Sequence, residues 1–170
     1  MTTNEQPQHR YGEHYRVDSM EAAREAVQSL LDQARYQVDI LSPHLDPQLY
    51  DQGPALEALR RVVVDGRHRA RIRILVADPE QITQRGHRLV NLARQLSTYM
   101  DIRKLGEDDI TDPPCWLIVD RQSHARWEAG TGYDGIVGPG CRAESVRLER
   151  AFSDRWSRSV ADPSLRRLHI

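Results

Sequence analysis

The sequence has almost no lysine. Of its 24 basic residues only Lys104 is a lysine, so a mechanism that requires an ammonium group has a single candidate position. We attribute the arginine bias to base composition rather than to function. Cysteine is equally scarce: Cys115 and Cys141 form no C-x-x-C pair and stand in no Cys/His zinc spacing. We therefore expect no metal and no cofactor, and a reduced, cytoplasmic protein.

Long apolar runs are missing as well. No stretch reaches the length needed to cross a bilayer, and residues 1–17 lack the apolar centre of a secretory signal. In a chain of 170 residues we expect a polar N-terminal tail over residues 1–17 and one domain over residues 18–170. The net charge of −1 argues against a dedicated nucleic-acid binder, although a local basic face is compatible with it.

Helical and extended apolar patterns alternate along the chain. The helical spacing predicts helices over residues 18–36, 53–69 and 142–160, and a helix or a loop and a helix over residues 79–99. Asp18 or Ser19 is the candidate N-cap of the first helix. Short apolar runs predict strands over residues 37–42, 70–78, 100–105 and 115–120. Residues 121–140 carry turn dipeptides, with room for one or two irregular strands. The order predicts an α/β fold, a mixed, mostly parallel sheet flanked by helices on both faces.

Ligands of open parallel sheets bind beyond the carboxyl ends of the strands, which makes Ser42, His44 and Asp78 candidates. Loop residues near Gly130 to Tyr133 are further candidates at the same place. His87 and Arg88 stand near the start of a predicted helix, where free backbone N–H groups favour an anion. We therefore name His44, His87 and Arg88 as candidate anion-binding residues. The alternative interpretations are a loop histidine beside two prolines and a solvated helix start.

Four segments resemble a known superfamily. They are "ILSPHLDPQLYDQGPALEALRRVVVDGRHRARIRILVAD" (40–78), "MDIRKL" (100–105), "CWLIVDRQS" (115–123) and "AFSDRWSRS" (151–159). In this order they resemble one repeat of the phospholipase D-like superfamily, with its closing Phe-x-x-x-Trp helix, over roughly residues 20–160. The superfamily's signature is HxKxxxxD, in which the histidine attacks a phosphodiester and the lysine stabilises the developing charge.

Only the acid of that signature is present. With the pattern aligned on Asp120, the histidine position falls on Pro113 and the lysine position on Cys115. "GTGYDG" (130–135) stands where the superfamily has a small polar stretch, but without its asparagine. The resemblance therefore implies a degenerate bacterial member with no catalytic residue.

Such a member would be a non-catalytic binding or protein-interaction module. Its implied partners are another protein, a second copy of the chain, or a phosphate-bearing ligand in a vestigial anion-binding cleft. Two alternatives stay open. One is a phosphodiesterase-type hydrolase with a relocated site that uses His44 or His87. The other is a nucleic-acid-associated protein that uses the arginines of residues 60–73 and 148–159, although we favour a solvated surface for both stretches.

Overall fold

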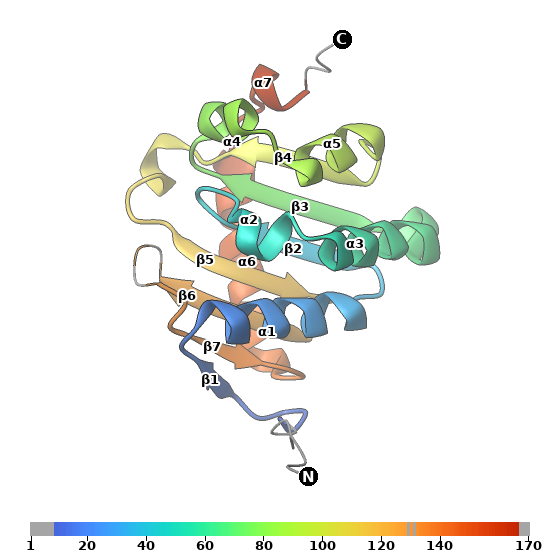
Figure 1. Ribbon diagram of the computed structural model, residues 1–170, viewed down its shortest axis with the longest axis vertical. Coiled ribbons are helices and arrows are strands. Elements are labelled where there is room, and N and C mark those ends of the chain that lie inside the picture. Colours follow the sequence, from blue (N-terminus) through green and yellow to red (C-terminus); the bar gives the residue numbers. More distant parts are fainter. Residues whose placement is uncertain (1–8, 129, 131, 167–170) are drawn as a thin grey trace.

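A mixed sheet runs through the whole molecule. The computed structural model describes residues 9–128, 130 and 132–166, and the strands lie in the order β1-β7-β6-β5-β2-β3-β4 (Figure 1). The strands are β1 (Tyr15–Val17), β2 (Gln37–Leu41), β3 (Arg71–Val76), β4 (Met100–Lys104), β5 (Pro114–Val119), β6 (Ser123–Glu128) and β7 (Gly135–Gly138). The four strands expected from apolar runs are all present, and residues 121–140 form two regular strands rather than irregular ones.

The α/β class and the mixed sheet are confirmed, but the expectation that most strands are parallel is wrong. Only the β2–β3 and β3–β4 pairs are parallel, while the pairs β2–β5, β5–β6, β6–β7 and β7–β1 are antiparallel. For the consecutive strands β5–β6 and β6–β7 the reason is the length of the connections. A parallel pair needs a crossover of a dozen or more residues, whereas β5 and β6 are joined by a tight turn at Asp120–Gln122.

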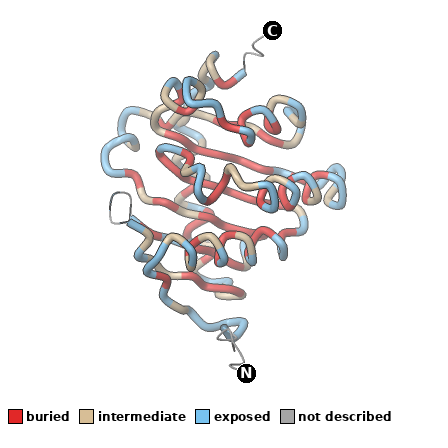
Figure 2. The backbone as a smooth tube through the Cα atoms, viewed as in Figure 1, coloured by how far each residue is buried: buried red, intermediate tan, exposed pale blue. Residues whose placement is uncertain are grey.

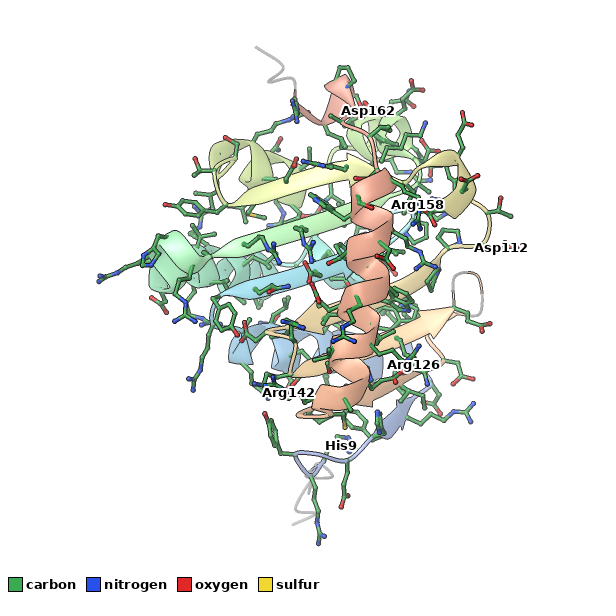
Figure 3. The ribbon with its side chains drawn as sticks, turned by 180° about the vertical axis from the view of Figure 1, so that it is seen from behind. His9, Asp112, Arg126, Arg142, Arg158 and Asp162 are labelled. Atoms are coloured by element: carbon green, nitrogen blue, oxygen red, sulfur yellow. The ribbon has the colours of Figure 1, made fainter. Side chains whose placement is uncertain are left out.

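Helices cover both faces of the sheet, as expected. In Figure 1, one layer of helices lies in front of the sheet and a single long helix, α6, crosses behind the strands. Figure 3 shows the same helix from behind, where it crosses the strands of the sheet. The front layer and its flanks comprise α1 (Met20–Gln33), α2 (Pro47–Tyr50), α3 (Gly53–Gly66), α4 (Pro79–Arg85), α5 (Arg88–Gln95) and α7 (Pro163–Arg166), while α6 spans Arg142–Arg158. Two short 3₁₀ turns, η1 (Arg67–Arg69) and η2 (Glu107–Asp109), complete the chain. No described helix is both long and apolar enough to span a bilayer.

Local chemistry sets the helix boundaries. α1 begins at the predicted cap, because the Ser19 hydroxyl accepts a hydrogen bond from the backbone N–H of Ala22. The predicted helix over residues 79–99 is divided into α4 and α5 at Gly86, whose φ of 74° lies in the left-handed region that favours glycine. Asp78 caps α4 by accepting from the N–H of Gln81.

The sheet separates two apolar layers, which appear as buried stretches of backbone in Figure 2. The front layer packs α1, α3 and α5 on the sheet. The back layer, under α6, is smaller and is built around Leu148 and Phe152. It also contains a buried ion network, in which the Arg73 guanidinium contacts the Asp39 carboxylate at 2.7 Å and the Glu149 carboxylate at 3.2 Å.

The N-terminal boundary differs from the expected one. Residues 15–17, assigned to a polar tail, form β1, which pairs antiparallel with β7 at one edge of the sheet. Val17 is buried and Tyr15 packs on the front core. The strand has three residues with Arg16 between two apolar neighbours, too short a pattern to stand out within a polar segment. Of the expected tail, residues 1–8 lie outside the described part of the chain.

Candidate ligand-binding pocket

A pocket of about 530 Å³ lies where β2 ends and β5 begins. We call it the strand-end pocket. It is lined by side chains from the loop after β2, from α4, from the start of β5 and from the β6–β7 connection: Ser42, Pro43, His44, Asp46, Pro47, Gln81, Arg85, Cys115, Trp127, Glu128, Gly130, Gly132 and Tyr133. The pocket lies beyond the carboxyl end of β2, where the sequence predicts a ligand site, and ligand binding there stays a prediction.

Cys115 forms part of the inner wall of this pocket. Its side chain is buried, and it occupies the position that the resemblance assigns to a catalytic lysine. Burial, with a smaller contribution from the charge of Asp46, raises the pKa of the Cys115 thiol to about 12. The group is therefore a neutral thiol near neutral pH, and it supplies neither a cation nor a nucleophilic thiolate.

A carboxylate fixes the shape of the pocket. Asp46 caps α2 by accepting from the N–H of Gln48 at 2.9 Å, and its second oxygen accepts from the Tyr133 hydroxyl at 2.8 Å. The bond joins the loop after β2 to the β6–β7 connection across 87 residues of sequence. Burial and this carboxylate raise the pKa of Tyr133 to about 12, so the hydroxyl stays a donor. Both carboxylate oxygens of Asp46 are thereby used within the protein.

His44 and Arg85 are the exposed donors of the pocket. Both line it, and neither forms a side-chain hydrogen bond or ion pair with a described residue. The Ser42 hydroxyl accepts from the N–H of Asp46, which leaves its own proton available for a ligand. Trp127 and Tyr133 add flat apolar surface beside these donors. The pocket thus combines a guanidinium, an imidazole and aromatic rings.

The three candidate anion-binding residues do not lie together. Only His44 lines the strand-end pocket. His87 is buried at the start of α5, where Nδ1 accepts from the N–H of Leu89 at 3.2 Å and Nε2 lies 3.0 Å from the carbonyl oxygen of Leu45. This arrangement fits a neutral ring with the proton on Nε2, and burial lowers the pKa of His87 accordingly.

Arg88, the third candidate, is bound to a neighbouring loop. Its guanidinium donates to the carboxylate and to the backbone carbonyl of Asp51, each at 2.7 Å. Anion binding by His87 or Arg88 would require these bonds to be exchanged, and it stays a prediction. Among the described residues, no group of three histidine, cysteine or acidic side chains is arranged to hold a metal ion.

Asp120 lies at the opposite end of β5 from Cys115. Its carboxylate accepts three backbone N–H bonds, from Arg35 at 2.8 Å, Tyr36 at 3.0 Å and Gln37 at 2.9 Å. These bonds hold the turn between α1 and β2. The one residue of the signature that is kept in this sequence therefore has a structural role here, away from the pocket. Pro113, buried just before β5, offers no reactive side chain.

Sequence reasoning found part of this pocket. The sequence predicted Ser42, His44 and loop residues near Gly130 and Tyr133 as site residues, and it marked Cys115 only as a position of the signature. It did not predict Arg85 or Asp46. Asp46 precedes Pro47 in a helix-capping pattern, which was the signal available for it. Arg85 had none, because its place depends on how α4 packs beside the loop after β2.

Comparisons with known proteins agree with this architecture. A family model described as a domain of unknown function, DUF7931, matches residues 19–168. A comparison with curated proteins finds no match.

Several solved structures share the fold at low sequence identity. TrmBL2, an archaeal chromatin protein described as showing a novel mode of DNA binding, matches with a TM-score of 0.62 at 12% identity over 92% of this chain and 55% of its own. The chain thus spans about half the length of TrmBL2. Nuc from Salmonella typhimurium, a phospholipase D family member, matches with a TM-score of 0.54 at 13% identity, over 87% of this chain and 97% of its own. NucT from Helicobacter pylori matches with a TM-score of 0.57 at 13% identity, over 88% of this chain and 100% of its own. At these identities the comparisons establish a phospholipase D-like fold.

Proposed function

Because this chain belongs to the DUF7931 family, whose description assigns no activity, we propose a function from the strand-end pocket. The chain acts as a non-catalytic binding domain of phospholipase D-like fold, a degenerate relative of the enzymes, and its pocket takes a small phosphate-bearing ligand. The observation that carries this proposal is the wall of the pocket, where a buried, protonated Cys115 stands in place of a catalytic cation.

Two positions of the HxKxxxxD signature explain why the superfamily's reaction is not expected of this chain. Pro113 has no group that can attack phosphorus, and the Cys115 thiol is not ionised near neutral pH. The route through a phosphohistidine that the resemblance implies therefore has no nucleophile and no adjacent cation. Asp120 does not replace them, because three backbone N–H groups occupy its carboxylate at the far end of β5.

The ligand class follows from the donors that remain. The Arg85 guanidinium can bind two oxygens of one phosphate, and His44 and Ser42 can donate to a third. Trp127 and Tyr133 provide rings on which a flat apolar group can stack. Asp46 keeps its negative charge, but both of its oxygens accept hydrogen bonds from the protein, so the carboxylate does not compete with a ligand for Arg85, His44 or Ser42. A mononucleotide has both a phosphate and a flat ring, which makes it a suitable probe.

The test is isothermal titration calorimetry with adenosine monophosphate and with inorganic phosphate. A charged hydrogen bond contributes about 1.5–3 kcal/mol, so Arg85→Gln should weaken nucleotide binding about 10-fold or more. His44→Gln should weaken it less, and Arg150→Gln, on the exposed side of α6, should leave it unchanged. Equal affinity in the wild type and in both pocket variants would overturn the proposal.

A second candidate is a hydrolase whose site has moved to His44. It is favoured by one observation: His44 is exposed in the same pocket as Arg85, while both ring nitrogens of His87 are hydrogen-bonded inside the protein. Hydrolysis of bis(p-nitrophenyl) phosphate that disappears in His44→Ala and persists in His87→Asn would favour this candidate. Absence of turnover in the wild type would exclude this activity toward that diester.

A further inference from the structure

The end of the sheet opposite the strand-end pocket carries a group of exposed arginines. Three connections meet there: the α1–β2 turn, the η1 turn before β3, and the β5–β6 turn, all at the right-hand end of the sheet in Figure 1. We call this group the arginine surface. It consists of Arg35, Arg67, Arg69, Arg71 and Arg121, with His68 among them, and all six residues are exposed.

Hydrogen bonds and strand pairing hold these residues beside one another. The N–H of Arg71 donates to the carbonyl of Tyr36 at 2.7 Å, and the guanidinium of Arg69 lies 4.9 Å from the centre of the Tyr36 ring. Asp120, which precedes Arg121, accepts from the N–H of Arg35. Neighbouring strands lie about 4.8 Å apart, so the step from β5 through β2 to β3 spreads the charges over about 10 Å.

The charges of this surface are largely uncompensated. Arg35, Arg67, Arg69 and Arg71 form no ion pair with a described residue, and Arg121 reaches Glu149 only at 3.4 Å. Several arginines elsewhere are matched with acids: Arg16 with Asp134, Arg88 with Asp51, Arg147 with Glu144 and Arg158 with Asp109. Those without an acidic partner among the described residues, such as Arg85, Arg150 and Arg166, are scattered over other elements and do not form a group with the arginine surface. In a chain with a net charge of −1, this end therefore carries a local positive excess.

Among the described residues, Glu149 is the one acid that forms an ion pair with an arginine of this surface, and the other nearby acids have different partners. The carboxylate of Asp65 lies 4.0 Å from the guanidinium of Arg61. That guanidinium also donates hydrogen bonds to three backbone carbonyl groups at the end of α1. The carboxylate of Asp32 accepts from Gln28. Asp120 is occupied by three backbone N–H groups. The guanidinium groups of this surface, apart from that of Arg121, therefore have no acidic partner within the part of the chain that the structure describes.

We propose that the arginine surface binds the phosphate backbone of a nucleic acid. Guanidinium groups bind phosphate oxygens in pairs, and contacts of this kind position a protein on a duplex without reading its sequence. A span of about 10 Å covers several backbone charges, since each strand of a duplex carries one phosphate per 3.4 Å of helix axis. A membrane surface is a poorer match, because interfacial binding buries a face of several large apolar side chains. Val64 is exposed near this surface, but Tyr36 is half-covered beneath Arg69.

Fluorescence anisotropy with a labelled duplex of about 20 base pairs, at salt concentrations from about 50 to about 200 mM, tests this proposal. The wild type should bind, and its affinity should fall steeply as salt rises. Arg67→Gln/Arg69→Gln should weaken binding at least about 10-fold at the lower salt and should reduce the slope of log K against log salt by about 2. The matched control is Arg150→Gln/Arg166→Gln, which removes the same charge from exposed sites on α6 and α7 and should bind as the wild type does.

Several outcomes would overturn the proposal. They are no binding by the wild type, an equal loss in both double variants, or binding to phosphatidylserine vesicles with none to DNA. Circular dichroism melts of both variants ensure that a loss of binding is not a loss of fold. Arg85→Gln separates this surface from the strand-end pocket, because it should weaken nucleotide binding in the pocket and leave duplex binding unchanged.

Discussion

Replacing Asp120 tests whether the kept residue of the signature is structural. Asp120→Ala removes the acceptor for three N–H groups, of which that of Gln37 is buried and those of Arg35 and Tyr36 are partly buried. A buried donor left without a partner costs about 1–3 kcal/mol, and each of the two others about 0.5–1.5 kcal/mol. We therefore expect the free energy of unfolding to fall by about 3–5 kcal/mol, a large part of a typical total of about 5–15 kcal/mol.

Urea denaturation measures this loss directly. With a slope of about 2 kcal/mol per molar urea, the midpoint should move down by about 2 M in Asp120→Ala. The urea midpoint of Asp120→Asn should lie between those of the wild type and of the alanine variant. The asparagine amide keeps one acceptor oxygen, but it places an NH₂ donor against a backbone N–H group. Nucleotide affinity, measured below the unfolding range, should be unchanged in both. A loss under 1 kcal/mol, or lost nucleotide binding at wild-type stability, would refute the structural role.

Three further predictions follow from buried groups. Burial, followed by the charge of His14, lowers the pKa of His124 to about 4, so its contribution to stability is present above pH 6.5 and is lost as the pH falls toward 4. The free energy of unfolding should therefore be about 2 kcal/mol lower at pH 5 than at pH 7 because of this group alone. In His124→Asn, the urea midpoint should decrease less between pH 7 and pH 5 than it does in the wild type. Cys115, with its raised pKa, should resist iodoacetamide in the folded protein at pH 8 while the more exposed Cys141 is alkylated, as peptide mass spectrometry would report. Arg73→Met strands the buried carboxylate of Asp39 and should cost about 3–5 kcal/mol in urea denaturation.

For each of these three predictions, one outcome would contradict the reasoning. An equal fall in stability with pH in the wild type and in His124→Asn would show that other groups carry it. Alkylation of Cys115 at the rate of Cys141 would show that the thiol is accessible or ionised. A stable Arg73→Met variant would mean that α6 docks through Leu148 and Phe152 without the ion network.

Much of the fold could be predicted because the spacing of apolar residues along the chain indicates where helices and strands form. The strand at residues 37–42 and the helix capped at Ser19 follow from apolar spacing and from one hydroxyl. The direction of β5 does not follow from such patterns. It depends on which neighbour the strand pairs with, and the loop of polar residues after β4 leaves that choice open to tertiary packing.

The candidate site was predictable only in part, for a related reason. His44 follows a strand, and its place near a ligand is a general property of such sheets. His87 satisfies the same kind of pattern, but packing turned it inward, where Leu45 and Leu89 use both of its nitrogens. The isolation of the arginines at the far end is likewise invisible in sequence, because whether an arginine has an acidic partner depends on residues up to 118 positions away, as in the pair of Arg16 and Asp134.

The pairing of β1 with β7 has a practical consequence for anyone who shortens this chain. A truncation that begins at residue 18, where the sequence suggests the domain starts, would remove Tyr15 and Val17 from the core and uncover the backbone of β7. An uncovered edge strand is a template on which further molecules can add, so such a fragment should self-associate. Expression of this domain therefore calls for an earlier start, before the glutamate at position 13.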